Sequence, residues 1–154
     1  SSLYSIGRSA KRAIEEARRR VASLINCKPE EIYFTSCGSE SDNTALKGIA
    51  YSNKNKGKHI ITSKIEHPAI LHSCQNLENK GFEVTYLDVD KNGFVNLQSL
   101  ENSIRSDTIL ISIMFANNEI GTIEPIEEIA KMTNGEVTET SKKHAMELRL
   151  ANVG

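Results

Sequence analysis

The run HIITSKIEHPAIL, residues 59–71, joins a short strand to the start of a helix through a polar junction. HIITS, residues 59–63, is rich in β-branched residues and predicts a strand. Pro68 suits the first turn of a helix, where its missing N–H leaves no bond unmade. The apolar face of that helix consists of Ile70, Leu71, Cys74 and Leu77. A strand that leads into a helix in this way is the repeating unit of a parallel α/β sheet.

The same alternation continues on both sides of this run. Upstream, an amphipathic helix starts at Ser9 and ends before Pro29, residues 32–35 predict a buried strand, and a helix covers about 40–52. Downstream, the pattern predicts a strand at 83–89, a turn at 91–93, a helix at 96–104, a strand at 108–116 that is buried on both faces, and a helix from 124. The fold class is therefore α/β, with a parallel sheet, right-handed crossovers and flanking helices.

Length and charge limit the classes of function. The 154 residues fit one domain, and 19 Lys and Arg against 20 Asp and Glu give a net charge of −1. This balance favours neither nucleic acid nor an anionic membrane as a partner. Apolar runs such as ILISIMFA are too short to cross a bilayer, and no signal peptide is recognised, so we expect a cytoplasmic location.

The cysteines and histidines do not indicate a metal site. Cys27, Cys37 and Cys74 match neither a CxxC pair nor a zinc finger, so free thiols are expected. His67 and His72 are five residues apart, which does not place two ligands on one helical face. We therefore predict no bound metal.

Three polar junctions follow predicted strands, and they carry the candidate site. They are TSCGSES at 35–41, SKIEHPA at 63–69 and ANNEIGT at 116–122. Taken singly, they are a helix cap, a loop histidine and a turn. However, parallel strands end at one edge of their sheet, so the junctions are expected to converge on one ligand. The first would hold an anion at a helix N-terminus, His67 could stack on a flat ring or exchange protons, and the adjacent asparagines supply amide donors.

A phosphate holder, a stacking ring and an amide donor together suit an aromatic phosphorylated cofactor. Four motifs in order resemble the cysteine desulfurases of nitrogen fixation and iron–sulfur cluster assembly, which are pyridoxal 5′-phosphate enzymes of the class V aminotransferase group. These motifs are FTSCGSESDN, KHIITSKIEHPAIL, GFEVTYLDVDKNGFV and SIMFANNEIGTIEPI. The resemblance implies that residues 1–132 are part of the cofactor-binding large domain of a fold-type I enzyme, followed by an unmatched tail at 133–154.

The resemblance also implies the roles of individual residues. Gly38 and Ser39 would hold the phosphate of pyridoxal 5′-phosphate. His67 would be catalytic, because it would stack on the pyridine ring and help to move protons. Asn118 would contact the ring or the substrate carboxylate.

Two further residues, Glu40 and Asn43, are expected to support the phosphate-binding turn. The family implies L-cysteine as substrate, alanine as product, transfer of a persulfide sulfur to an acceptor or scaffold protein, and a homodimer. The tail TNGEVTETSKKHAMELRLANVG does not align with the family's Asp, Gln and His-Lys series, and its catalytic-cysteine segment is not matched, so the chain alone is expected to be inactive. The alternatives are a selenocysteine lyase or another class V enzyme, and a non-catalytic remnant that acts as an interaction module.

Overall fold

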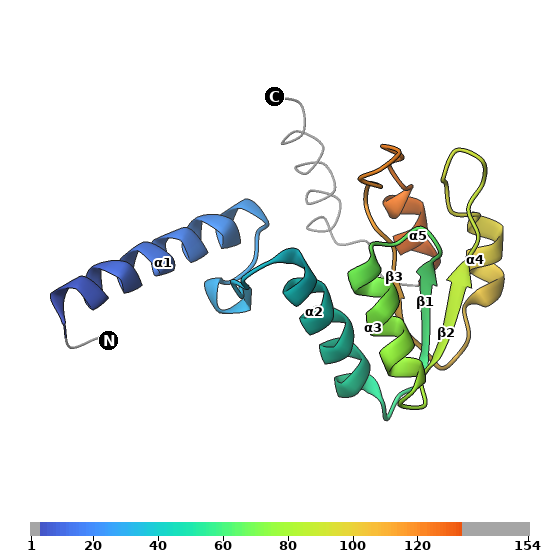
Figure 1. Cartoon of the computed structure of the whole chain (residues 1–154), viewed down its shortest axis with the longest axis horizontal. Coiled ribbons are helices and arrows are strands. Elements are labelled where there is room, and N and C mark those ends of the chain that lie inside the picture. Colours follow the sequence, from blue (N-terminus) through green and yellow to red (C-terminus); the bar gives the residue numbers. More distant parts are fainter. Residues whose placement is uncertain (1–3, 134–154) are drawn as a thin grey trace. The chain divides into compact units, whose positions relative to one another are not determined.

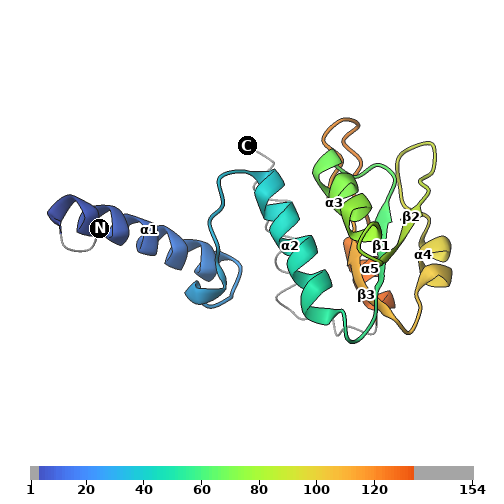
Figure 2. The same cartoon turned by 60° about the horizontal axis from the view of Figure 1, so that its bottom comes forward.

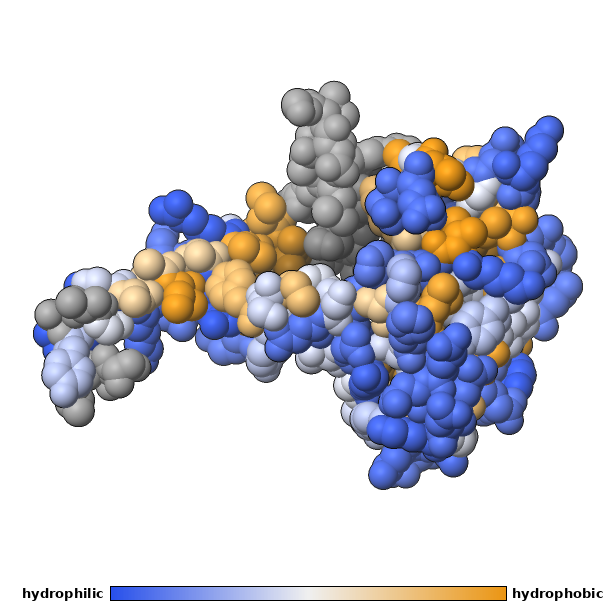
Figure 3. Space-filling model, viewed as in Figure 1, coloured by the Kyte–Doolittle hydropathy of each residue, from blue (hydrophilic) through white to orange (hydrophobic). Residues whose placement is uncertain are grey.

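The computed structural model describes residues 4–133, which divide into two compact units at Phe34 and Thr35. The first unit contains helix α1 (Ser5–Leu24) and the 3₁₀ turn η1 (Pro29–Glu31). Helix α1 starts earlier than predicted, and Glu16 pairs with Arg19 and Arg20 one turn later, at 3.0 Å in each case. Apolar residues are visible along the surface of this helix in Figure 3. Ile14 and Leu24 of α1 are both exposed.

The predicted buried strand at 32–35 is wrong. After η1 the chain is extended but joins no sheet within the described residues, and Tyr33 and Phe34 are 80% and 51% exposed. The carbonyl of Ile32 accepts a hydrogen bond from the Arg18 guanidinium, which also lies 5.2 Å from the centroid of the Phe34 ring. The β-branched and aromatic composition therefore did not identify a strand here, because β propensity measures fit to a half-buried surface and not a preference of the backbone itself.

The second unit contains a three-stranded parallel sheet in the order β2-β1-β3 (Figure 1). Its elements are α2 (Gly38–Asn53), β1 (His59–Ser63), α3 (Pro68–Glu78), β2 (Glu83–Leu87), α4 (Leu97–Ser103), β3 (Thr108–Ser112) and α5 (Ile126–Met132). The predicted α/β class and parallel sheet are confirmed. The predicted strands at 59–63, 83–89 and 108–116 are present, the last two in shorter form.

The central strand β1 divides the hydrophobic core of this unit in two. Ile60 and Ile61 are both fully buried and belong to different clusters, because successive side chains of a strand point to opposite faces. Helices α2 and α3 lie together on one face, as Figures 1 and 2 show, and pack Leu46 and Leu77 with Ile60. Helices α4 and α5 supply Leu100 and Ile129 to the other cluster. The unit is therefore a three-layer α/β/α arrangement.

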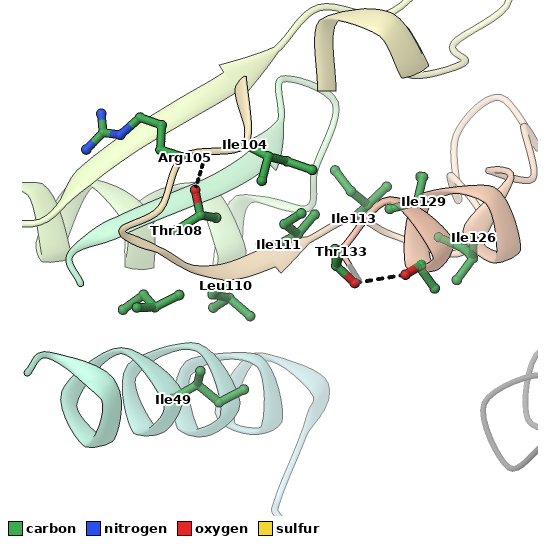
Figure 4. Close-up of a pocket in the computed structure, with 12 residues that line it drawn as sticks. Ile49, Ile104, Arg105, Thr108, Leu110, Ile111, Ile113, Ile126, Ile129 and Thr133 are labelled. Carbon is green, nitrogen blue, oxygen red and sulfur yellow. Dashed lines mark hydrogen bonds between the residues drawn. The ribbon is translucent and has the colours of Figure 1, made fainter. Parts of the chain in front are cut away.

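Strand β3 was predicted to be buried on both faces, and this is not observed. All five of its residues are partly exposed, because within residues 4–133 it pairs only with β1. An apolar groove of about 670 Å³ lies beside β3 (Figure 4). Ile49 of α2 borders it on one side, and Ile126 and Ile129 of α5 border it on the other. No helix within the described range is long and apolar enough to cross a membrane.

Candidate functional site

The carboxyl edge of the sheet carries a cavity between two loops. Strands β1 and β3 are parallel neighbours that end at Ser63 and Ser112, so the segments that follow them leave the sheet at the same edge. Residues 64–68 and 117–120 line a cavity of about 300 Å³ there. His67 comes from the first loop and Asn118 from the second. Two of the three predicted junctions therefore meet at one cavity.

His67 is held by the helix that it precedes. It is the N-cap residue of α3, and its Nδ1 accepts a hydrogen bond from the N–H of Ala69 at 3.1 Å. In the neutral imidazole the nitrogen that accepts cannot carry the proton, so the proton is on Nε2. The side chain is exposed beside the cavity. Nε2–H is therefore the ring atom that can donate to a ligand.

Asn118 lies in a tight turn that follows β3. The N–H of Gly121 donates to the carbonyl of Asn117 at 2.9 Å, and the N–H of Asn117 donates to the carbonyl of Thr122 at 2.8 Å. Gly121 has a φ of 76°, a conformation that glycine adopts without strain. Asn118 is exposed on this turn, and it borders the same cavity as His67.

The N-terminus of α2 offers a separate group of donors. The backbone N–H groups of Gly38, Ser39 and Glu40 have no partner within residues 4–133, as expected for the first turn of a helix. A methyl group added at Gly38 would meet nothing within 4 Å, so a ligand can approach the backbone there. The Ser39 hydroxyl is exposed beside these N–H groups. Together they suit an anion such as a phosphate ester.

Glu40 and Asn43 brace this helix start. The Glu40 carboxylate accepts from the N–H and the hydroxyl of Ser36, both at 2.7 Å, and these hydrogen bonds hold the pKa of Glu40 below its usual value. Asn43 donates to the carbonyl of Ser39 at 2.8 Å and accepts from the Ser73 hydroxyl of α3 at 2.7 Å. These contacts order the start of α2, and the support of a phosphate by these two residues stays a prediction.

The structure places the anion donors near the cavity but not in it. Helices α2 and α3 both begin at the edge toward which β1 points (Figure 1), but Gly38 and Ser39 do not line the cavity of His67 and Asn118. Burial is the main cause that raises the pKa of Glu66 in the loop before α3, and the negative charge of Asp42, in the first turns of α2, adds to it. The helix start therefore lies within electrostatic range of that loop.

Sequence reasoning gave Glu66 no role, and it grouped Asn117 with Asn118 as an amide donor to a ligand, not as a buried support. Glu66 and Asn117 are both buried, and each precedes one of the residues that had been singled out. Burial raises the pKa of Glu66, and hydrogen bonds from the Met114 N–H and the Ser63 hydroxyl oppose this increase. The available signal was their place in the junctions: a carboxylate and an amide directly after strands of the sheet need buried partners.

These groups fit a phosphorylated aromatic ligand. Three unpaired N–H groups and a hydroxyl suit the phosphate, the exposed imidazole suits a ring face, and the Asn118 amide can donate or accept at the ring edge. The fold thus defines a parallel α/β protein, with a cavity at the carboxyl ends of its strands that is the candidate ligand site. A model of the aminotransferase class-V family matches residues 1–137. The chain belongs to this family, and the resemblance seen in the motifs is confirmed.

Within this family, the chain is similar in sequence to curated cysteine desulfurases. The chain is 62% identical over 132 residues to the cysteine desulfurase IscS of Methanosarcina thermophila. The aligned residues cover 86% of this chain and 33% of that relative. It is 61% identical over 132 residues to the cysteine desulfurase IscS of Clostridium botulinum (strain Kyoto / Type A2), with the same coverage of both chains. The chain thus spans about a third of the length of these relatives.

The chain is also similar, in fold and in sequence, to solved structures. A NifS-like protein superimposes with a TM-score of 0.81 at 42% identity, over 87% of this chain and 37% of its own. DndA from Streptomyces lividans gives a TM-score of 0.79 at 40% identity, over 88% of this chain and 38% of its own. SspA in complex with cysteine gives 0.76 at 42% identity, over 83% of this chain and 37% of its own.

Proposed function

We propose that this chain is part of a pyridoxal 5′-phosphate-dependent cysteine desulfurase, and that its second unit holds the cofactor at the carboxyl edge of the sheet. The observation that carries the proposal is the meeting of His67 and Asn118 at one cavity, beside a helix start with unpaired N–H groups. The identity to cysteine desulfurases supports the choice of ligand.

The start of α2 would bind the phosphate. Gly38, Ser39 and Glu40 point unpaired N–H groups out of the helix, and the partial positive charge of the helix terminus favours an anion. The Ser39 hydroxyl adds a donor. Because the Glu40 carboxylate accepts hydrogen bonds from the N–H and the hydroxyl of Ser36, its negative charge lies against a residue that precedes the helix.

His67 and Asn118 would hold the ring. Pyridoxal phosphate, when bound, supplies an electron sink for bond breaking at the carbon atoms of an amino acid. The bond from Ala69 to Nδ1 keeps the imidazole oriented, so that its face can stack on the ring while Nε2 holds a proton. This is the basis for the catalytic role that we assign to His67. The Asn118 amide would contact the ring or a substrate carboxylate.

The whole protein would take sulfur from L-cysteine and leave alanine. The sulfur would pass as a persulfide to an acceptor or scaffold protein, and the enzyme would act as a homodimer in the cytoplasm. Support for the substrate comes from a similar solved structure, SspA, which is in complex with cysteine.

The proposal is tested by titrating the chain with pyridoxal phosphate, pyridoxal and inorganic phosphate while recording amide and side-chain NMR signals. We expect pyridoxal phosphate to shift Gly38, Ser39, His67 and Asn118, with a dissociation constant on the order of 1 mM. Inorganic phosphate should shift only Gly38 and Ser39.

Substitutions sharpen this test. His67→Ala should weaken the binding of pyridoxal phosphate and leave phosphate binding intact, whereas Ser39→Ala should weaken both. His72→Ala is the matched control, because His72 is an exposed histidine on α3 that does not line the cavity. If distant lysines shift while Gly38, Ser39 and His67 do not, the cofactor reacts nonspecifically and the site assignment is wrong.

A further inference from the structure

The backbone ladder between β1 and β3 ends just before the cavity. The last paired residues are Thr62 and Ser112, and the Thr62 hydroxyl donates to the Ser112 carbonyl at 2.8 Å. Beyond this pair, the segments that follow β1 and β3 separate into the loops that carry His67 and Asn118. Because the separated loops have no regular ladder between them, their spacing depends on side chains.

Glu66 makes the first connection across this gap. Its Oε1 accepts from the N–H of Met114, which follows β3, at 2.6 Å. The same oxygen accepts from the Ser63 hydroxyl at the end of β1 at 3.2 Å. The Glu66 side chain is buried, and its residue is 7% exposed. A carboxylate from one loop therefore takes the backbone donor of the other, where a strand partner would otherwise have supplied a carbonyl.

Asn117 makes the second connection in the opposite direction. Its Nδ2 donates to the carbonyl of Ile65 in the first loop at 3.1 Å. Its Oδ1 accepts from the N–H groups of Glu119 and Ile120, at 2.9 and 3.1 Å. One amide thus shapes the turn around Asn118 and ties that turn to the other loop. Asn117 is 8% exposed, so water competes little for these bonds.

We propose that Glu66 and Asn117 are positioning residues: together they form a clamp between the two loops that sets the spacing between the His67 ring and the Asn118 amide. Each lies one position before the residue that it places, and each is buried where that residue is exposed. A ligand held from both sides needs this spacing to be fixed before it binds. The inference rests on the proposed function only for the identity of the ligand.

The first test uses the protein without ligand. Asn117→Asp keeps an acceptor for Glu119 and Ile120, so the turn remains, but it removes the donor to Ile65 and places a carboxylate against that carbonyl. We expect loss of nuclear Overhauser contacts between residues 64–68 and 117–120, while contacts between Thr62 and Ser112 persist. Asn79→Asp, the same change at an exposed position after α3, should leave both sets unchanged.

Glu66 supplies an independent variant pair. Glu66→Gln retains an acceptor oxygen, so the Met114 amide should exchange its hydrogen as slowly as in the unsubstituted chain. Glu66→Ala leaves that amide without its acceptor, so we expect its exchange to accelerate. Equal exchange rates of the Met114 amide in the two variants would contradict the role of the Glu66 oxygen as its hydrogen-bond acceptor. A melting temperature lowered equally in both would indicate packing alone.

The second test measures ligand binding. Asn117→Asp and Glu66→Ala should weaken pyridoxal phosphate binding about tenfold, because misplaced groups lose binding and reaction geometry together. The affinity for inorganic phosphate at Gly38 and Ser39 should not change, whereas general destabilisation would lower both. Loss of the loop contacts with unchanged affinity for pyridoxal phosphate would overturn the proposal.

The two proposals fail in different ways. If pyridoxal phosphate does not shift His67 or Asn118 in the unsubstituted chain, the proposed function fails. The clamp is then still tested by the contacts between residues 64–68 and 117–120 in the ligand-free protein. If these contacts persist in Asn117→Asp, the clamp proposal is overturned, and if they are lost, it is supported.

Discussion

The His59 ring on β1 lies 2.7 Å from the Thr108 hydroxyl on β3, measured from Nδ1 to Oγ1. The two residues are register partners at the amino end of the sheet. On its other side the ring places Nε2 2.8 Å from the Thr85 hydroxyl on β2. His59 is 1% exposed, so one buried imidazole links all three described strands.

This arrangement predicts a pH-dependent stability. Burial lowers the pKa of His59, the Arg105 charge lowers it further, and Asp107 and Glu83 oppose the change. The folded protein therefore holds the proton less tightly than the unfolded chain, whose histidine titrates at about 6.5. The stabilisation by His59 is complete above a pH of about 6.5 and is lost as the pH falls toward the lowered pKa of the folded protein.

Urea unfolding between about pH 7.5 and 5 should show this decrease in stability, and His59→Gln should remove the decrease. His72→Gln, at an exposed site, should retain it; an identical pH profile for His59→Gln would contradict the assignment.

The two threonines beside His59 should differ in importance. Thr108→Val leaves His59 Nδ1 and the Arg105 N–H without a partner, whereas Thr85→Val leaves only His59 Nε2 without one. Leaving a buried polar group unpaired costs about 1–3 kcal/mol, so both variants should lower the free energy of unfolding, and Thr108→Val should lower it more. Chemical denaturation measures the difference. Thr44→Val, at an exposed position of α2, should have little effect.

Two glycines provide a matched pair for backbone packing. A Cβ at Gly57 would clash with the backbone carbonyl of Asp107, whereas one at Gly48 in α2 would meet nothing within 4 Å. We expect Gly57→Ala to destabilise the protein by about 1–3 kcal/mol through forced backbone movement. Gly48→Ala should stabilise it by about 0.5–1 kcal/mol, because alanine favours a helix interior. Thermal unfolding of the two variants should give shifts of opposite sign; shifts of the same sign would mean that the Gly57 contact is relieved at no cost.

The cysteines should react with alkylating reagents in a fixed order. Cys37 is exposed at the start of α2, whereas Cys74 is fully buried between α3 and the sheet. Burial, together with the charges of Glu78 and Glu66, raises the pKa of Cys74 to about 11, so little thiolate is present at neutral pH. Mass spectrometry after timed treatment with iodoacetamide should show Cys37 modified first and Cys74 only after denaturant is added. Early modification of Cys74 in the folded protein would contradict its burial.

Local patterns in the sequence were sufficient for most of the second unit. The β-branched run at 59–63 and Pro68 with its apolar face identify β1 and α3, because strand and helix periodicities and a proline in a first turn are local properties. Parallel pairing followed from the alternation of strands and helices. Because parallel strands end at one edge, the sequence also indicated that His67 and Asn118 would meet.

The sequence by itself determined most helices and strands of the second unit, and which polar junctions would lie at the carboxyl edge. The tertiary structure decided the rest. Residues 32–35 have the composition of a strand but pair with no strand among residues 4–133, and Arg18 of α1 contacts the Ile32 carbonyl and the Phe34 ring instead. Strand β3 has the composition of a central strand but is partly exposed, because burial depends on its neighbours. Only the folded chain reveals that Glu66 and Asn117 join the two loops, because their partners Met114 and Ile65 lie about fifty residues away in sequence. Such long-range hydrogen bonds leave no periodic signal in the chain.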